Sequence, residues 1–184
     1  HEVSHGLVSM LTGGDFHKFY VHPTGGGVSV TSGGKTKLVV SAGYIGTVLF
    51  GAVYLAKSAQ SDAMITVLYI VALLYALSII KAGDLHTASV GIAIGACVGL
   101  VTHLAPGTIF TRMVLNIIGV ILILEGLRSL WHLHIAAATT TGTGSDAEAM
   151  SRLSGGHPIH WAFLYSAVAI LILFALYTVV MHSQ

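Results

Sequence analysis

The chain has 184 residues, of which 54% are hydrophobic and only 8% are charged, and its formal net charge is +1. A soluble domain carries about 25% charged residues, so water cannot be the solvent for most of this surface. The near-neutral charge and the lack of a basic cluster with interleaved aromatic residues argue against nucleic acid as a partner. The composition therefore indicates an integral membrane protein in contact with the lipid bilayer.

The chain begins with the sequence His1-Glu2-Val3-Ser4-His5. Residues four apart lie on the same face of a helix, so the imidazoles of His1 and His5 can bind one metal ion. Glu2 projects nearby and can accept a proton from the attacking water. Because catalytic zinc sites have three protein ligands and an open position, the pattern predicts Zn²⁺ at His1 and His5, with Glu2 as general base.

Apolar runs dominate the rest of the chain. Residues 1–12 are helical in character but too short to cross a bilayer, and we expect them to be the second half of a spanning helix. Each later run is close to the roughly 20 residues that cross a bilayer as a helix. These runs cover residues 38–56, 63–80, 85–104, 109–127 and 159–181. The sequence thus predicts an all-α polytopic membrane protein, multi-pass, with about six transmembrane helices, the first one truncated.

Residues 13–37 form neither a spanning helix nor a compact domain. Two short strands are predicted at residues 16–22 and 27–31, joined by turn residues at 23–26 and closed by glycines at 33 and 34. A lone hairpin is marginally stable in water, so we expect this one to lean on the membrane domain. Two interpretations remain open for it, a plain connector or an edge strand that pairs with an extended peptide beside the metal.

Small residues recur where helices are expected to approach closely. The run at 38–56 contains Ser41-Ala42-Gly43-Tyr44-Ile45-Gly46, and Gly91, Gly95 and Gly99 recur every four residues further along. In a bilayer such residues allow close helix packing. We expect the ridge of Gly91, Gly95 and Gly99 to serve packing and not chemistry.

A third metal ligand must come from elsewhere in the chain. Ser145 is a predicted N-cap of a short helix that ends near residue 153, inside a loop at residues 133–158. By topology this loop lies on the same side of the bilayer as the end of the first helix. Asp146 can therefore approach the metal, whereas Asp62 cannot do so without crossing the bilayer.

Three other residues remain candidates for the third ligand. Glu125 lies deep in a predicted span, where an ionisable group is a functional candidate, although it can also pair with Arg128. His132 and His134 flank the loop and could each supply an imidazole. Their competing interpretation is a place at the membrane interface beside Trp131.

The order of these features resembles a known family. The His-Glu-x-x-His motif is followed by a Gly-rich hairpin, a helix that opens with residues 41–44 (Ser-Ala-Gly-Tyr), and a late Ser145-Asp146-Ala147 before the last span. This order resembles the site-2 protease superfamily of intramembrane zinc metalloproteases, and most closely its compact peptidase M50B-like branch. The resemblance covers nearly the whole chain and implies a single membrane-embedded metalloprotease-like domain over residues 1–184.

The resemblance also implies roles for individual residues. His1 and His5 correspond to the zinc ligands, Glu2 to the general base, and Asp146 to the aspartate that completes the metal site. The implied activity is zinc-dependent endopeptidase cleavage in or near a transmembrane helix of a membrane-protein substrate. One departure is that Asp146 is followed by Ala147, where the superfamily usually has an Asp-Gly pair.

That departure motivates an alternative function, an inactive protease-like scaffold or accessory subunit bound to the other subunits of a membrane complex. The 11 histidines also suggest a metal transporter. Transporter sites need ionisable residues inside several spanning helices, whereas these histidines lie mostly at segment ends. We therefore place the transporter third.

Overall fold

The computed structural model describes residues 1–23, 25–58, 73, 75–105, 108–139, 142 and 144–182, and most of them are helical. The named helices are α1 (Glu2–Leu11), α2 (Thr36–Ser58), α4 (Leu85–Leu104), α5 (Ile109–Thr139), α6 (Asp146–Ser154) and α7 (Pro158–His182). Residues 75–81 are helical as well. An antiparallel hairpin of β1 (Gly14–Val21) and β2 (Gly27–Gly33) follows α1. The helical class and the hairpin are confirmed.

Three helices in the described part of the chain are long and apolar enough to cross a bilayer, namely Thr36–Ala56 within α2, α5 and α7. The apolar stretch of α4 is shorter and covers Leu85–Val101. Most of the predicted span at residues 63–80, together with Asp62, lies outside the described residues. The described residues thus support a membrane protein, but they do not establish the expected six spans.

The predicted end of one span is wrong. The apolar run at 109–127 was expected to stop there, but α5 continues to Thr139, so residues 133–139 are helical and not part of a loop. The polar residues after Leu124 lower the hydropathy without interrupting the helix, because Glu and Arg are good helix formers. Leu133 and Ala137 are buried in the core and stabilise this last part of α5.

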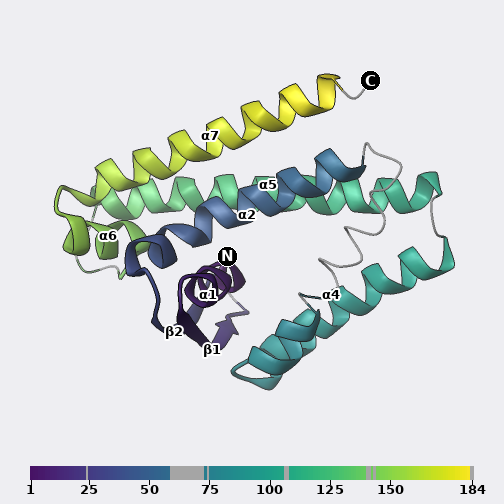
Figure 1. Ribbon diagram of the computed structural model, residues 1–184, viewed down its shortest axis with the longest axis horizontal. Coiled ribbons are helices and arrows are strands. Elements are labelled where there is room, and N and C mark those ends of the chain that lie inside the picture. Colours follow the sequence, from purple (N-terminus) through teal and green to yellow (C-terminus); the bar gives the residue numbers. More distant parts are fainter. Residues whose placement is uncertain are drawn as a thin grey trace.

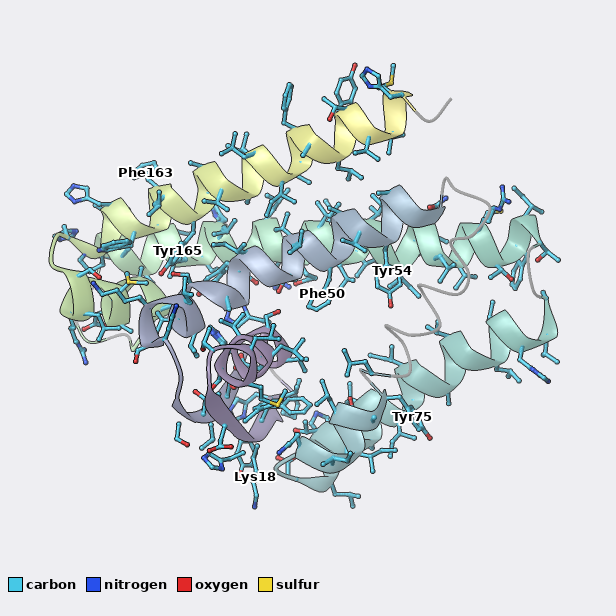
Figure 2. The ribbon with its side chains drawn as sticks, viewed as in Figure 1. Lys18, Phe50, Tyr54, Tyr75, Phe163 and Tyr165 are labelled. Carbon is cyan, nitrogen blue, oxygen red and sulfur yellow. The ribbon has the colours of Figure 1, made fainter. Side chains whose placement is uncertain are left out.

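The main layer of the fold consists of α2, α5 and α7, with α2 packed on both of the others (Figure 1). Its core joins residues of α2, α5, α6 and α7, including Val48, Leu130, Ala147 and Tyr165. Tyr165 lies on the face of α7 toward the other helices and is 1% exposed, whereas Phe163 points away from them (Figure 2). The far half of α2 packs closely on α5, because a Cβ on Gly51 would lie 2.8 Å from the carbonyl oxygen of Gly119.

The first helix and the hairpin form a second, smaller packing unit. Phe16 and Phe19 of β1 are buried, with Val3 and Leu7 of α1 packed against their cluster. Gly6 of α1 leaves room for the ring of Phe16, because a Cβ there would overlap it. The hairpin therefore leans on a hydrophobic helix, as expected from its small size.

The two outer edges of the hairpin differ. On β1, the carbonyl of Phe19 accepts from the N–H of Gly83 at 2.7 Å, and the N–H of Val21 donates to Oγ1 of Thr87 at 2.9 Å. Within the described residues, β2 forms no backbone–backbone hydrogen bond beyond the hairpin. On β2, the carbonyl of Ser32 accepts a side-chain hydrogen bond from Ser9 of α1 at 3.5 Å. The edge of β1 is thus covered by backbone and side chain, whereas most of the described edge of β2 remains available.

The glycine ridge of α4 packs as predicted at two of its three positions. A Cβ on Gly91 would overlap the side chain of Ser78, and one on Gly95 would overlap Tyr75. A Cβ on Gly99 would meet no described atom within 4 Å. Gly91 and Gly95 therefore allow α4 to approach residues 75–81.

Candidate metal centre

The first helix brings both predicted histidine ligands to one side. His1 is the N-cap residue of α1 and His5 lies one turn further, with their ring centroids 4.9 Å apart. Nδ1 of buried His5 lies 2.6 Å from the carbonyl oxygen of Val39 in α2. Since a carbonyl only accepts, Nδ1 carries the proton and donates it. Nε2 of His5 is left with its lone pair free for a metal, which is the usual arrangement of a ligating histidine.

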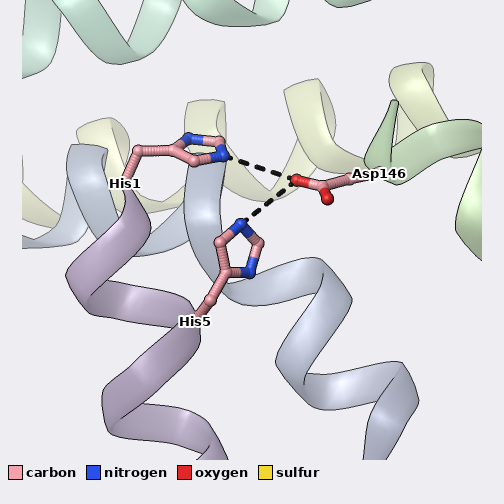
Figure 3. A group of neighbouring side chains, drawn as sticks. All are labelled: His1, His5 and Asp146. Carbon is pink, nitrogen blue, oxygen red and sulfur yellow. Dashed lines mark ion pairs between the residues drawn. The ribbon is translucent and has the colours of Figure 1, made fainter. Parts of the chain in front are cut away.

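Asp146 reaches the same point from the start of α6. Its Oδ2 atom lies 3.4 Å from Nε2 of His1 and 3.4 Å from Nε2 of His5 (Figure 3). Ligand atoms of the three residues lie within 4.8 Å of one another, the one such group found in the described part of the chain. The structure thus brings together the two histidines and the aspartate that the sequence analysis selected.

Contacts within the preceding loop and α6 hold Asp146 in place. Ser145 is the N-cap of α6, and its side chain accepts from the N–H of Glu148. The Glu148 carboxylate accepts from the N–H groups of Gly142 and Gly144 at 3.0 Å and pairs with Arg152 at 2.5 Å. These interactions lower the pKa of Glu148 to about 2, chiefly through Arg152. The predicted short helix and its Ser145 cap are confirmed.

The electrostatics at Asp146 favour a bound cation. Burial alone would raise the pKa of Asp146, but the neighbouring imidazoles of His1 and His5 outweigh this effect and hold it at about 2. The buried Oδ2 atom nevertheless forms no hydrogen bond with the described residues. An ionised oxygen buried without a partner is costly unless a positive group faces it.

The donor set and its spacing fit zinc. Two imidazole nitrogens and one carboxylate oxygen are a common ligand set for a catalytic zinc ion. Ligand atoms around a tetrahedral zinc are roughly 3.4 Å apart, given bond lengths near 2.0–2.2 Å. The spacing from Oδ2 to each Nε2 therefore agrees with a site that needs little rearrangement to take up the ion.

The start of α2 packs directly against the two histidines. A Cβ on Gly43 would lie 2.5 Å from Nε2 of His5 and would also overlap the ring of His1. The ring of Tyr44 meets His1 edge-on, with centroids 4.5 Å apart, and stacks on Tyr165 at 6.1 Å. Ser41 completes the row, with its Oγ 3.4 Å from the Tyr165 hydroxyl. The small residues at 41–46 thus allow close helix packing as predicted, and the structure shows that the partner is α1, since a Cβ on Gly46 would overlap the side chain of Ser4.

Glu2 lies beside the ligand group without belonging to it. It lines the same cavities as His1, and a Cβ on Gly27 of β2 would lie 2.8 Å from its Cγ. Its carboxylate therefore lies in the cavities that border the ligand group, where a general base must lie to reach a reacting water.

The other candidates for a third ligand are not in the metal group. Glu125 pairs with Arg128 at 3.3 Å, as its competing interpretation predicted. The ring of His134 contacts Phe163, with centroids 4.8 Å apart, and its Nδ1 lies 2.8 Å from the carbonyl oxygen of Leu130. His132 is exposed and lines a cavity opposite His1. Asp146 is therefore the carboxylate that the fold places at the two histidines.

Two cavities meet at this centre. One, of about 390 Å³, lies between β2 and the metal group and is lined by Ser29, Tyr44 and Asp146, among others. The other, of about 800 Å³, lies between the centre and α5. Sequence reasoning missed this wall of α5, although Glu125, Arg128, Ser129 and His132 recur there at helical spacing.

Comparison with known proteins assigns the chain to a family. The family model for peptidase M50B-like proteins matches residues 1–176, nearly the whole chain. The chain therefore belongs to the peptidase M50B-like family, and with it to the site-2 protease superfamily. No curated protein and no solved structure gave a significant match.

Proposed function

We propose that this protein is a zinc-dependent intramembrane endopeptidase, which hydrolyses peptide bonds in or near transmembrane segments of other membrane proteins. The observation that carries the proposal is the buried Oδ2 atom of Asp146, which lies 3.4 Å from Nε2 of both His1 and His5 in a chain of a peptidase family. In this proposal the three side chains hold the metal.

In this proposal the zinc ion, the general base and the orienting groups have separate roles in the reaction. Bound zinc would supply Lewis acidity, which polarises the scissile carbonyl and makes water acidic enough to react near neutral pH. Glu2 takes the proton from the attacking water and returns it to the leaving amine. The Val39 carbonyl and the Tyr44 ring fix the orientation of His5 and His1, respectively.

The hairpin provides a place for the substrate backbone. Val28 and Ser29 of β2 line the smaller cavity, and so do Tyr44 and Asp146. A substrate helix must unwind before a peptide bond can react, and its freed N–H and C=O groups need partners inside a membrane. Pairing with β2 supplies them, so we favour the edge-strand interpretation over the plain connector.

Ala147 does not keep Asp146 away from the histidines. Its side chain is fully buried in the core between α2, α5 and α7. The residue after Asp146 thus packs inward while the carboxylate reaches the centre. The absence of an Asp-Gly pair is therefore compatible with a three-ligand site, and the active enzyme is the better supported function.

The test uses the purified chain in proteoliposomes with a single-span peptide that contains a central Gly-Pro. We expect about one zinc per chain and cleavage by the parent protein. Glu2→Gln should keep the zinc and lose at least about 100-fold in rate, since general-base catalysis contributes on that order. His5→Ala should lose the zinc.

Cleavage by Glu2→Gln at the parent rate would overturn the role of Glu2. A metal-free, inactive parent protein that stays bound to membrane partners would instead support the scaffold.

A further inference from the structure

One face of α5 is polar although the helix is otherwise apolar enough to span a bilayer. The 800 Å³ cavity that His1 and Glu2 line is also lined by Glu125, Arg128, Ser129 and His132. Spacings of three, four and seven residues place these side chains on one helix face. Ionisable residues inside spanning helices are costly, so a polar face turned toward a reaction centre indicates a function.

The two side chains of the ion pair on this face are largely uncovered by protein. Nη1 of Arg128 lies 3.3 and 3.4 Å from the two carboxylate oxygens of Glu125, and the side chains are 67% and 54% exposed. Neither side chain is covered by protein over most of its surface, so the pair ties α5 to no other part of the fold. An incoming group can therefore replace Glu125 at Arg128 without disturbing the fold.

The unused hydrogen-bonding capacity of the face consists mainly of donors. A guanidinium group has five N–H donors, and within the described residues only Nη1 of Arg128 is engaged. The Ser129 hydroxyl and the His132 ring add donors beside it. Such a wall suits an acceptor, and a carboxylate suits it best because it can take two parallel bonds from one guanidinium.

We infer that this face is the substrate-recognition wall of the cavity, and that Arg128 binds an acidic side chain of the substrate near the scissile bond. The inference rests on the proposed function and adds the substrate class to it. Glu125 holds the guanidinium toward the cavity before the substrate arrives and then releases it. Arg128 is a specificity-determining residue in this account and takes no part in bond cleavage.

The experiment measures binding, so that it does not depend on turnover. Fluorescent single-span peptides carry one Glu, Gln or Lys at successive positions around a central Gly-Pro and are titrated against the zinc-treated Glu2→Gln chain in detergent. We expect the Glu peptide to bind about tenfold more tightly than the Gln peptide at one or two adjacent positions, as one charge-assisted pair allows.

Variants of α5 assign the preference to one residue. Arg128→Gln should remove the preference for Glu, and Arg128→Glu should reverse it in favour of Lys. Arg112→Gln is the matched control, since Arg112 is exposed on the same helix and does not line the cavity. Thermal unfolding of each variant is the control for an intact fold.

The possible outcomes separate the two proposals. Equal binding of all three peptides, or a preference that survives Arg128→Gln, overturns the recognition wall whether or not the parent chain is a peptidase. A preference that depends on Arg128 supports the wall, even if the parent chain cleaves none of the peptides. In that case only the proposed endopeptidase function fails.

Discussion

Gly43 and Gly51 lie eight residues apart on α2, yet they leave room for different groups. At Gly43 the space of a Cβ is taken by the rings of His1 and His5. At Gly51 it is taken by the backbone and side chain of α5, at Gly119 and Ile123. One half of α2 is thus shaped around the two histidines of the candidate metal centre, and the other half around helix packing.

Two tyrosines of α2 differ in the same way, one lying at the histidines and the other in a hydrophobic cluster. Tyr44 meets His1 edge-on at 4.5 Å. Tyr54 is 2% exposed and packs with Val98 and Leu115 in a separate hydrophobic cluster. The comparison indicates that metal binding and folding can be damaged independently along a single helix, which makes α2 the best place to test the account.

The largest effect is expected at Gly43. Gly43→Ala puts a methyl group into the space of the two imidazoles, so we expect the affinity for zinc to fall at least about 100-fold, the upper range for groups that only orient the ligands. Zinc titration of the purified variant, with Gly51→Ala as the matched control, measures this loss. Parent-like zinc binding by Gly43→Ala would show that α2 does not limit the site.

At Gly51 we expect a loss of stability and no loss of zinc. Gly51→Ala forces α2 and α5 apart, and overpacking of this kind costs about 1–3 kcal/mol of stability. Thermal unfolding in detergent should show the loss, while the zinc content stays at the parent value. If the variant loses zinc at parent-like stability, the division of α2 into two halves is wrong.

A smaller change is expected at Tyr44. Tyr44→Ala removes the ring that orients His1, and the affinity for zinc should fall about tenfold, as is typical for groups that support a ligand. Tyr54→Ala should destabilise the fold without changing zinc affinity in the protein that remains folded. Equal zinc affinities for the two variants would count against a positioning role for Tyr44.

The smallest effect is expected at Ser41. Its hydroxyl donates to the carbonyl of Lys37 within α2 at 2.8 Å and lies 3.4 Å from the Tyr165 hydroxyl, so Ser41→Ala should cost less than about 1 kcal/mol in stability and leave the zinc content unchanged. Chemical denaturation provides the measurement. A large loss of zinc would mean that the contacts from Ser41 through Tyr165 to Tyr44 orient His1 more strongly than their distances indicate.

The grouping of His1 and His5 could be predicted from the sequence because it depends on local spacing. The two residues are four apart, so a helix alone brings them together. For Asp146, topology allowed an approach to the histidines but left Glu125 and two later histidines as alternatives, and the family resemblance favoured the aspartate. Its distance from both histidines, 3.4 Å, could not be predicted, since the packing of α6 against α2 and α7 sets it.

Other features depended on tertiary packing that hydropathy does not record. The extension of α5 beyond Leu127 is stabilised by the burial of Leu133 and Ala137. Gly43 was expected to pack, but only the structure shows that the two imidazoles occupy its open side. That Glu125 and Glu2 line one cavity likewise depends on how α5 packs against α2, which no local pattern encodes.

The central claim is that Asp146, and not Glu125, completes a metal site with His1 and His5. The most direct measurement is the zinc content and affinity of purified Asp146→Asn beside Glu125→Gln. We predict that Asp146→Asn loses stoichiometric zinc while Glu125→Gln retains it at parent affinity. Zinc bound equally well by Asp146→Asn, or lost only in Glu125→Gln, would contradict the account.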